Sequence, residues 1–262
     1  MHGRVIVNTI CMRTKIAYLA IACASAMGAG CGSDECSGSA FSGTPATCGA
    51  SGTFERSVCV QGKLRKFREY VPPSLVCDTP PPLVLFLHGN GGDETSGDPA
   101  QPLADELGFV FVTLRGTDQE DYVGFGPADI PNSREFTLRV IDQVRSEFPT
   151  DPNFTLLTGF SGGAFLASYF IAWLNDRLRG VGIFGAGMAE DYFAELPRSQ
   201  VKLPVVIRIG SGDSLRYYAQ SLYSQLTQAG WPKDRIDFKV FDGGHTWNPE
   251  LIRDTFNWAK AF

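Results

Sequence analysis

The residues Thr158-Gly159-Phe160-Ser161-Gly162-Gly163, near the middle of the chain, have types and a spacing that suit nucleophilic chemistry. They follow a short apolar run and precede a pattern of apolar residues with helical spacing. A Gly-x-Ser-x-Gly sequence between a strand and a helix predicts a sharp turn, in which Gly159 and Gly163 must be small. Such a turn exposes the Ser161 hydroxyl and points the Gly162 N–H towards a reacting carbonyl.

A serine hydroxyl needs a base that removes its proton, and the chain has three histidines. His2 lies in the N-terminal leader, and His88 stands at the end of a predicted strand, 83–87. His245 follows the last predicted strand, where a Ser…Asp…His chain order places the base. Elimination and chain order therefore both predict His245 as the general base. The alternative is a surface histidine without a chemical role.

A carboxylate between the serine and the histidine should orient the imidazole and stabilise its positive charge. Asp213 follows the predicted strand 205–209 in a Gly-rich loop, at the carboxyl end of the sheet. We therefore predict that Asp213 is the third member of the group. Competing aspartates stand at three less suitable positions, Asp191, Asp234 and Asp242.

Backbone donors for a developing oxyanion are predicted at two places. Gly162 offers one N–H, and the Gly-rich loop 88–93 offers another, because glycine lets a backbone approach a ligand closely. We expect the Asn90 N–H to point inward, with Gly89 and Gly91 as the alternatives. No Lys-Ser/Thr pair follows this loop, which argues against a phosphate-binding P-loop.

Three residues beside these groups are candidates for substrate contacts: His88, Trp247 and Tyr122. Tyr122 and Phe125 lie in the long loop 115–131, and packing explains aromatic residues at such places equally well. For His88, we favour hydrogen bonds that hold the glycine-rich loop. With two histidines outside the leader and no Cys-x-x-Cys pattern, neither a metal site nor a cofactor is predicted.

The elements that position these residues alternate along the chain. Two predicted strands, 53–60 and 64–71, are joined by a hairpin turn at Gln61-Gly62. Apolar strands then alternate with helices, one of which is expected to begin at a capping box formed by Asn132 and Glu135. We count eight strands, which predicts an α/β fold with a mostly parallel sheet and helices on both faces.

The totals are consistent with one large domain of 262 residues, and a formal charge of −5 argues against a nucleic-acid partner. Residues 1–30 are predicted to be a signal peptide, too short in its apolar run to span a membrane comfortably. Met12 is the more natural start, so residues 1–11 are interpreted as a mis-called extension. Residues 31–53 predict a flexible tether, and residues 54–262 the folded catalytic domain.

Two processing sites remain open in the leader. Ala24-Ser25-Ala26 suits ordinary cleavage, whereas Gly28-Ala29-Gly30-Cys31 resembles a lipobox that departs from the usual pattern at Gly28. A lipid on Cys31 would be the protein's only membrane attachment.

The cysteines that remain after lipidation form an even set: Cys36, Cys48, Cys59 and Cys77. Four cysteines suit two disulfides in an oxidising compartment and allow three pairings. Cys36–Cys48 with Cys59–Cys77 closes the shortest loops. The alternative is free thiols in a cytosolic protein.

Four motifs together resemble a known family: His88-Gly-Asn-Gly-Gly, Gly159-Phe-Ser-Gly-Gly, Gly212-Asp213 and Gly244-His-Thr-Trp247. From about residue 62 to its end, the chain is similar to α/β-hydrolases of the polyhydroxybutyrate depolymerase and feruloyl esterase group, related to carbohydrate esterase family 1. The resemblance implies a serine esterase that acts through an acyl-enzyme on feruloyl, acetyl or short polyester esters. A serine peptidase and a non-catalytic, surface-anchored polysaccharide-binding protein are the alternatives.

Two departures from the family pattern leave the substrate open. Gly162 stands where the family commonly has Asn or Ala, and Asn248 stands where a Pro commonly follows the tryptophan. Neither departure affects the predicted catalytic groups.

Overall fold

The computed structural model describes residues 36–262 except for 37–40, 45, 77, 120–121 and 127–128 and for the side chains of Gln119, Tyr122 and Val123. The predicted signal peptide, the alternative start at Met12 and the lipid site at Cys31 lie outside the described residues. Within the described part, no helix has the length and apolar character that a membrane span requires.

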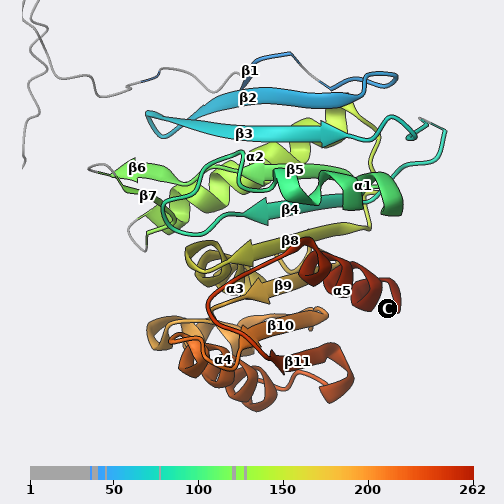
Figure 1. The fold of residues 1–262 in the computed structure, drawn as a ribbon. Coiled ribbons are helices and arrows are strands. Elements are labelled where there is room, and N and C mark those ends of the chain that lie inside the picture. Colours follow the sequence, from blue (N-terminus) through green and yellow to red (C-terminus); the bar gives the residue numbers. More distant parts are fainter. Residues whose placement is uncertain (1–35, 37–40, 45, 77, 120–121, 127–128) are drawn as a thin grey trace, which may run out of the picture. The chain divides into compact units, whose positions relative to one another are not determined.

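One nine-stranded sheet organises the fold (Figure 1). Its strands are β1 (Phe41–Ser42), β2 (Gly52–Val60), β3 (Lys63–Val71), β4 (Leu83–Leu87), β5 (Val110–Leu114), β8 (Thr155–Phe160), β9 (Gly180–Phe184), β10 (Val205–Gly210) and β11 (Ile236–Phe241). The spatial order is β1-β2-β3-β5-β4-β8-β9-β10-β11. The pairs from β1 to β5 along this order are antiparallel, and those from β5 to β11 are parallel. The sequence predicted eight strands, and β1 is the additional one.

A separate two-stranded ribbon, β6 (Thr117–Gln119) with β7 (Tyr122–Gly124), interrupts the long loop 115–131. The loop was expected to have no strands of its own. Its backbone pairing places Tyr122 opposite Gln119.

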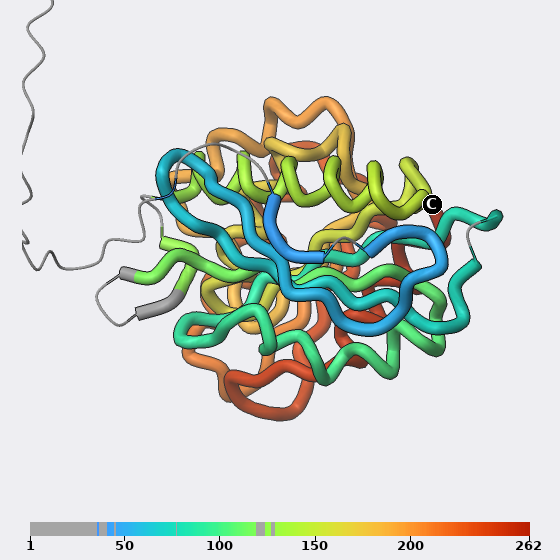
Figure 2. The backbone as a smooth tube through the Cα atoms, turned by 90° about the horizontal axis from the view of Figure 1, so that it is seen from above, coloured from blue at the N-terminus to red at the C-terminus, as the bar shows by residue number. Residues whose placement is uncertain are grey.

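Helices cover both faces of the sheet, as predicted, and Figure 2 shows α2 on the opposite side from α5. Their bounds are α1 (Gln101–Leu107), α2 (Ile130–Glu147), α3 (Gly162–Trp173), α4 (Arg216–Gln228) and α5 (Pro249–Lys260), with the short 3₁₀ helices η1 (Asp98–Ala100), η3 (Glu190–Arg198) and η4 (Lys233–Arg235). Two apolar clusters fill the space between the sheet and its helices. Leu85 belongs to the cluster that includes residues of α2, α3 and α4, and Phe86 belongs to the cluster that includes residues of α1 and α5. Burial on both faces is why β4 is apolar throughout and β5 is apolar except at Thr113, rather than alternating.

The start of α2 differs from the predicted capping box. The residue that precedes the helix is Asp129, and the Asn132 amide donates to its Oδ1 at 3.0 Å instead of capping the helix itself. Arg65, 64 positions earlier, donates to the other oxygen at 3.1 Å. Because a buried ion pair with a distant strand anchors this end, a local pattern did not reveal where the helix begins.

The predicted hairpin between β2 and β3 is confirmed. Its turn residues, Gln61 and Gly62, have φ values of 50° and 78°. Two consecutive positive φ values fit a two-residue hairpin turn whose twist matches that of the flanking strands.

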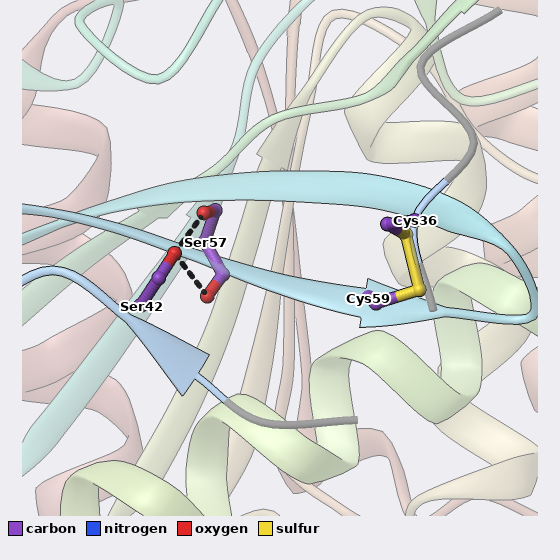
Figure 3. Close-up of a disulfide and its surroundings, with 4 residues drawn as sticks. All are labelled: Cys36, Ser42, Ser57 and Cys59. Atoms are coloured by element: carbon purple, nitrogen blue, oxygen red, sulfur yellow. Dashed lines mark hydrogen bonds between the residues drawn. A yellow bond between two sulfur atoms is a disulfide. The ribbon is translucent and has the colours of Figure 1, made fainter. Parts of the chain in front are cut away.

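A disulfide joins Cys36 to Cys59 in β2 (Figure 3). Of the three pairings that the sequence left open, this disulfide excludes the one with the shortest loops, Cys36–Cys48 with Cys59–Cys77. Cys48 is also disulfide-bonded, whereas Cys77 lies outside the described residues. Loop length therefore does not predict the pairing here, because the pairing of strands decides which cysteines lie close together.

That strand pairing is between β1 and β2. Phe41 lies opposite Val58 in antiparallel register, and the Ser42 and Ser57 hydroxyl oxygens lie 2.6 Å apart (Figure 3). The Cys36 N–H donates to the Gly62 O at 3.3 Å, so Cys36 lies at the hairpin end of β2, where Cys59 stands. The part of the predicted tether that includes β1 is therefore held against the sheet.

Candidate active site

Ser161 stands where β8 ends and α3 begins. Its φ of 52° and ψ of −116° are unfavourable for a residue with a side chain. The turn leaves no room beside it: a Cβ on Gly159 would lie 2.3 Å from the Gly163 O, and one on Gly163 would lie 2.1 Å from the Leu87 O. Packing therefore requires both glycines, and the strained turn presents Ser161 at the carboxyl edge of the sheet.

Three side chains from three loops form a continuous chain of hydrogen-bonding atoms at this edge. The Ser161 Oγ lies 2.9 Å from the His245 Nε2, and the His245 Nδ1 lies 2.8 Å from the Asp213 Oδ2. Asp213 follows β10 and His245 follows β11. Because β8, β10 and β11 run parallel, their carboxyl ends meet at one edge, and the three predicted residues are brought together.

Asp213 is held on both of its oxygens. Its side chain is 0% exposed, and Oδ1 accepts the Leu215 N–H at 2.8 Å. The competing Asp242 is exposed and is paired with the Ser211 hydroxyl at 3.4 Å. Asp191 and Asp234 are exposed in η3 and η4. Among the described residues, Asp213 is the aspartate that contacts His245.

Phe160 packs against the His245 ring, a contact that the sequence analysis left unassigned. Its ring lies 4.8 Å from the His245 ring, centroid to centroid, at an angle of 33°. Gly185 adjoins both rings, since a Cβ there would lie 2.7 Å from Phe160 Cε2 and 3.3 Å from His245 Cε1. The one sequence signal was the aromatic residue directly before Ser161.

The loop after β4 passes directly over the start of α3. A Cβ on Gly89 would lie 3.3 Å from the Ser161 Cβ, and one on Gly162 would lie 1.9 Å from the Asn90 Oδ1. The two residues predicted to supply oxyanion donors, Asn90 and Gly162, are therefore neighbours beside the serine. Among the described residues, no acceptor takes either of their backbone N–H groups. A bond from the Gly92 N–H to the Gly89 O, at 3.0 Å, closes the loop.

Comparison with known sequences gives one partial match. No protein-family model matches the chain. A bifunctional acetylxylan esterase/xylanase of Neocallimastix patriciarum is 29% identical over 141 residues, which cover 50% of this chain and 20% of that relative. The chain therefore spans about a fifth of the length of this curated relative.

Comparison with solved structures gives matches over most of the chain. A ferulic acid esterase from Anaeromyces mucronatus, in complex with ferulic acid, has a TM-score of 0.64 at 19% identity and covers 80% of this chain and 91% of its own. The S-formylglutathione hydrolase of Staphylococcus aureus has a TM-score of 0.64 at 15% identity, with 86% and 98% covered. The chain has the α/β-hydrolase fold. The predicted fold class is confirmed, with nine strands in place of eight.

His88 lies fully buried beneath the glycine-rich loop. Its Nδ1–H donates to the Gly89 O at 2.7 Å, and its Nε2 accepts the Gly116 N–H at 2.9 Å. Burial lowers the pKa of His88, so the imidazole is neutral at neutral pH, as this donor–acceptor pattern requires. The side chain does not reach the surface, so the candidate contact between His88 and substrate is wrong, whereas the favoured role of holding the glycine-rich loop by hydrogen bonds agrees with its contacts. It joins two loops of the site instead.

The other predicted substrate contacts have different outcomes. Trp247 packs on Phe86, with ring centroids 4.5 Å apart, and remains partly exposed at the edge of an apolar cluster. Phe125 is buried, 5.0 Å from the His88 ring. The Tyr122 side chain lies outside the described residues. Within the described part of the chain, no group of three or more His, Cys, Asp or Glu side chains is placed to hold a metal ion.

Proposed function

We propose that this α/β-hydrolase is a serine carboxylesterase. The observation that supports it most is the chain from the Ser161 Oγ through the His245 imidazole to the Asp213 carboxylate, with contacts of 2.9 and 2.8 Å. A serine hydroxyl is a weak nucleophile until a positioned base takes its proton. The paired carboxylate keeps the imidazole in the tautomer and orientation that this transfer needs.

The first half of the proposed reaction forms an acyl-enzyme. The Ser161 Oγ attacks the ester carbonyl carbon while the His245 Nε2 takes the hydroxyl proton. The carbonyl oxygen becomes an oxyanion, which the backbone N–H groups of Asn90 and Gly162 stabilise. The intermediate then breaks the bond to the alkoxy group, and this leaving group departs as an alcohol with the proton from His245. Asp213 stabilises the imidazolium that exists between the two proton transfers.

The second half returns the enzyme to its starting state. A water molecule attacks the acyl carbon and gives a proton to the His245 Nε2. Collapse of the second oxyanion breaks the bond to Ser161, which regains the proton, and the carboxylic acid departs. Because His245 is 38% exposed, water reaches the base directly.

Feruloyl and acetyl esters attached to plant polysaccharide are the proposed substrates, and short hydroxybutyrate polyesters are the alternative. The names of two similar proteins support the first class, since one is an acetylxylan esterase/xylanase and the other a ferulic acid esterase solved with ferulic acid. We include export in the proposal. The Cys36–Cys59 disulfide supports it, because disulfides persist in oxidising compartments.

A panel of esters tests this function. The full chain and its Ser161→Ala variant are assayed on p-nitrophenyl acetate, p-nitrophenyl butyrate, methyl ferulate, acetylated xylan and a hydroxybutyrate oligomer. We expect hydrolysis by the wild type and a fall of about 10⁶-fold in kcat in the variant, since loss of the nucleophile removes the whole covalent route. An unchanged circular dichroism spectrum controls for folding. Equal rates in the two proteins would contradict the proposal, and so would an inert wild type.

A further inference from the structure

A hollow of about 450 Å³ lies between η3 and α4 and is not used by the proposed reaction. Its lining residues are Glu190, Phe193, Tyr217, Gln220, Ser221, Ser224 and Gln225. Five of them follow one stripe of α4 at helical spacing, from Tyr217 to Gln225, a length of about 12 Å at 1.5 Å per residue. The hollow is therefore elongated and is lined by aromatic rings, amides and hydroxyls.

The aromatic side of the hollow is rigid and open to solvent. Tyr217 is 58% exposed, which is unusual for a large side chain, yet its hydroxyl donates to the Glu190 Oε1 at 2.6 Å. Its ring also meets that of Tyr218 edge-on at 5.6 Å, and Tyr218 in turn meets Phe165 at 5.1 Å. The flat face of Tyr217 is thus held in place before any ligand binds, which reduces the entropy lost on binding.

The two elements that form this hollow follow, along the chain, segments that belong to the serine site. On the α4 side, Tyr217 stands four positions after Asp213. On the η3 side, the segment that leads to Glu190 begins at Gly185, where a Cβ would lie 3.3 Å from His245 Cε1. The same segment contacts the start of α4, since a Cβ on Gly187 would lie 2.1 Å from the Tyr218 O. Both walls of the hollow therefore begin within a few residues of groups that hold or contact His245.

We propose that the hollow binds the sugar chain of a polysaccharide whose ester group enters the serine site. A sugar ring offers an apolar C–H face, which matches an exposed aromatic ring, and hydroxyls that both donate and accept hydrogen bonds. The amides of Gln220 and Gln225 and the hydroxyls of Ser221 and Ser224 have the same double capacity. This inference rests on the proposed esterase function and adds the position of the polymer.

The lining also argues against other ligands. A polyester chain has acceptors but no donors along its length, so it could use the amide and hydroxyl donors of the lining but not the acceptors of Gln220 and Gln225. Among the described residues, no Lys or Arg lines the hollow, and Glu190 gives it a negative charge, so an anionic polymer is not expected to bind there.

Binding to the inactive Ser161→Ala protein tests the site without turnover. Xylohexaose is titrated into this protein by calorimetry, and then into variants of it that also carry Tyr217→Ala or Tyr217→Phe. We expect Tyr217→Ala to weaken binding about tenfold, the effect of one stacked ring, and Tyr217→Phe to weaken it less than threefold. Tyr70→Ala is the matched control: Tyr70 also donates to a carboxylate, Asp105 at 2.8 Å, but lies outside the hollow, and its removal should leave binding unchanged.

The outcomes separate this inference from the esterase proposal, because the ester panel measures small substrates independently. Hydrolysis of methyl ferulate by the wild type, with equal xylohexaose affinity in the Tyr217→Ala and Tyr70→Ala proteins, would overturn the sugar site alone. No binding of xylohexaose, or binding of a hydroxybutyrate trimer in its place, would overturn it too. Tyr217-dependent binding of xylohexaose by a protein that hydrolyses no ester would support the site and contradict the esterase proposal.

Discussion

Two carboxyl groups of this protein are equally hidden from water but differently surrounded. The side chains of Asp213 and Glu69 are both 0% exposed. Asp213 has a donor on each oxygen, the Leu215 N–H at 2.8 Å and the His245 Nδ1 at 2.8 Å. Glu69, in β3 beneath α2, has no hydrogen-bond partner on either oxygen among the described residues, and its ion-pair partner Arg56 is 3.6 Å away.

The difference arises because Arg56 is shared. Its guanidinium bonds to Glu147 through both terminal nitrogens, at 2.6 and 3.0 Å, and so turns its donors away from Glu69. Burial raises the pKa of Glu69 to about 7, which Arg56 opposes and the charge of Glu147 reinforces. Burial alone therefore does not decide what a carboxyl group does. Hydrogen-bond donors make one a fixed part of the site, and their absence makes the other a proton-binding group.

Asp213→Asn tests the carboxyl group that has a donor on each oxygen, and it has the largest expected effect, on kcat. The amide cannot accept the Nδ1–H with the same charge and favours the wrong imidazole tautomer, so we expect kcat for p-nitrophenyl acetate to fall about 10⁴-fold. Asp242→Asn, on the loop that carries His245, is the matched control and should change kcat less than twofold. Similar losses in both variants would show that the third member of the triad has been wrongly assigned.

Glu69→Gln gives the next largest effect, and it acts on stability. The folded-state pKa of about 7 lies above the usual 4.5, so folding favours the protonated form. That stabilisation is complete below about pH 4.5 and is lost as the pH rises through 7, by roughly 3 kcal/mol in all. Urea unfolding at pH 5, 6, 7 and 8 should show this decline in the wild type and a weaker one in the variant, which cannot ionise. Parallel pH profiles would refute the assignment.

Glu147→Gln should give the smallest effect. It removes the neighbouring negative charge and weakens the hold of Glu147 on Arg56, so the guanidinium is free to bond to Glu69. The pKa of Glu69 should then fall, and the loss of stability between pH 5 and 8 should shrink by about 1 kcal/mol. The same urea series measures this as a flatter slope, irrespective of the stability at any one pH. A steeper slope than in the wild type would mean that Arg56 does not serve both carboxylates.

The sequence predicted Ser161, His245 and Asp213 because their positions follow from topology. Each of the three comes directly after a strand in a parallel arrangement, so chain order and elimination were enough to bring them to one edge. Trp247 and His88 were harder to assign, because a residue beside a site can pack inward, and only the neighbouring elements decide. His88 proved to be fully buried and Trp247 to lie on Phe86.

The features that the sequence did not predict depend on contacts between distant segments. The Cys36–Cys59 pairing follows from the register of β1 on β2, and β1 is too short to give an alternating pattern. Glu69 is a carboxyl group at an inward-facing position of β3 where the alternation predicts an apolar residue. Its burial is compensated by the buried Arg56 guanidinium, 3.6 Å away in the neighbouring strand. Each of these features depends on a contact with a residue that is distant in the sequence, so a short stretch of sequence does not predict it.

Covalent capture of Ser161 tests the central claim most directly. The intact protein is treated with a fluorophosphonate, an electrophile that requires an activated serine and no knowledge of the natural ester, and the labelled peptide is identified by mass spectrometry. We predict one equivalent of label, on Ser161, with none in Ser161→Ala and labelling about 10⁴-fold slower in Asp213→Asn, as expected when the base loses its orientation. Labelling at another serine, or undiminished labelling of Ser161→Ala, would contradict the account.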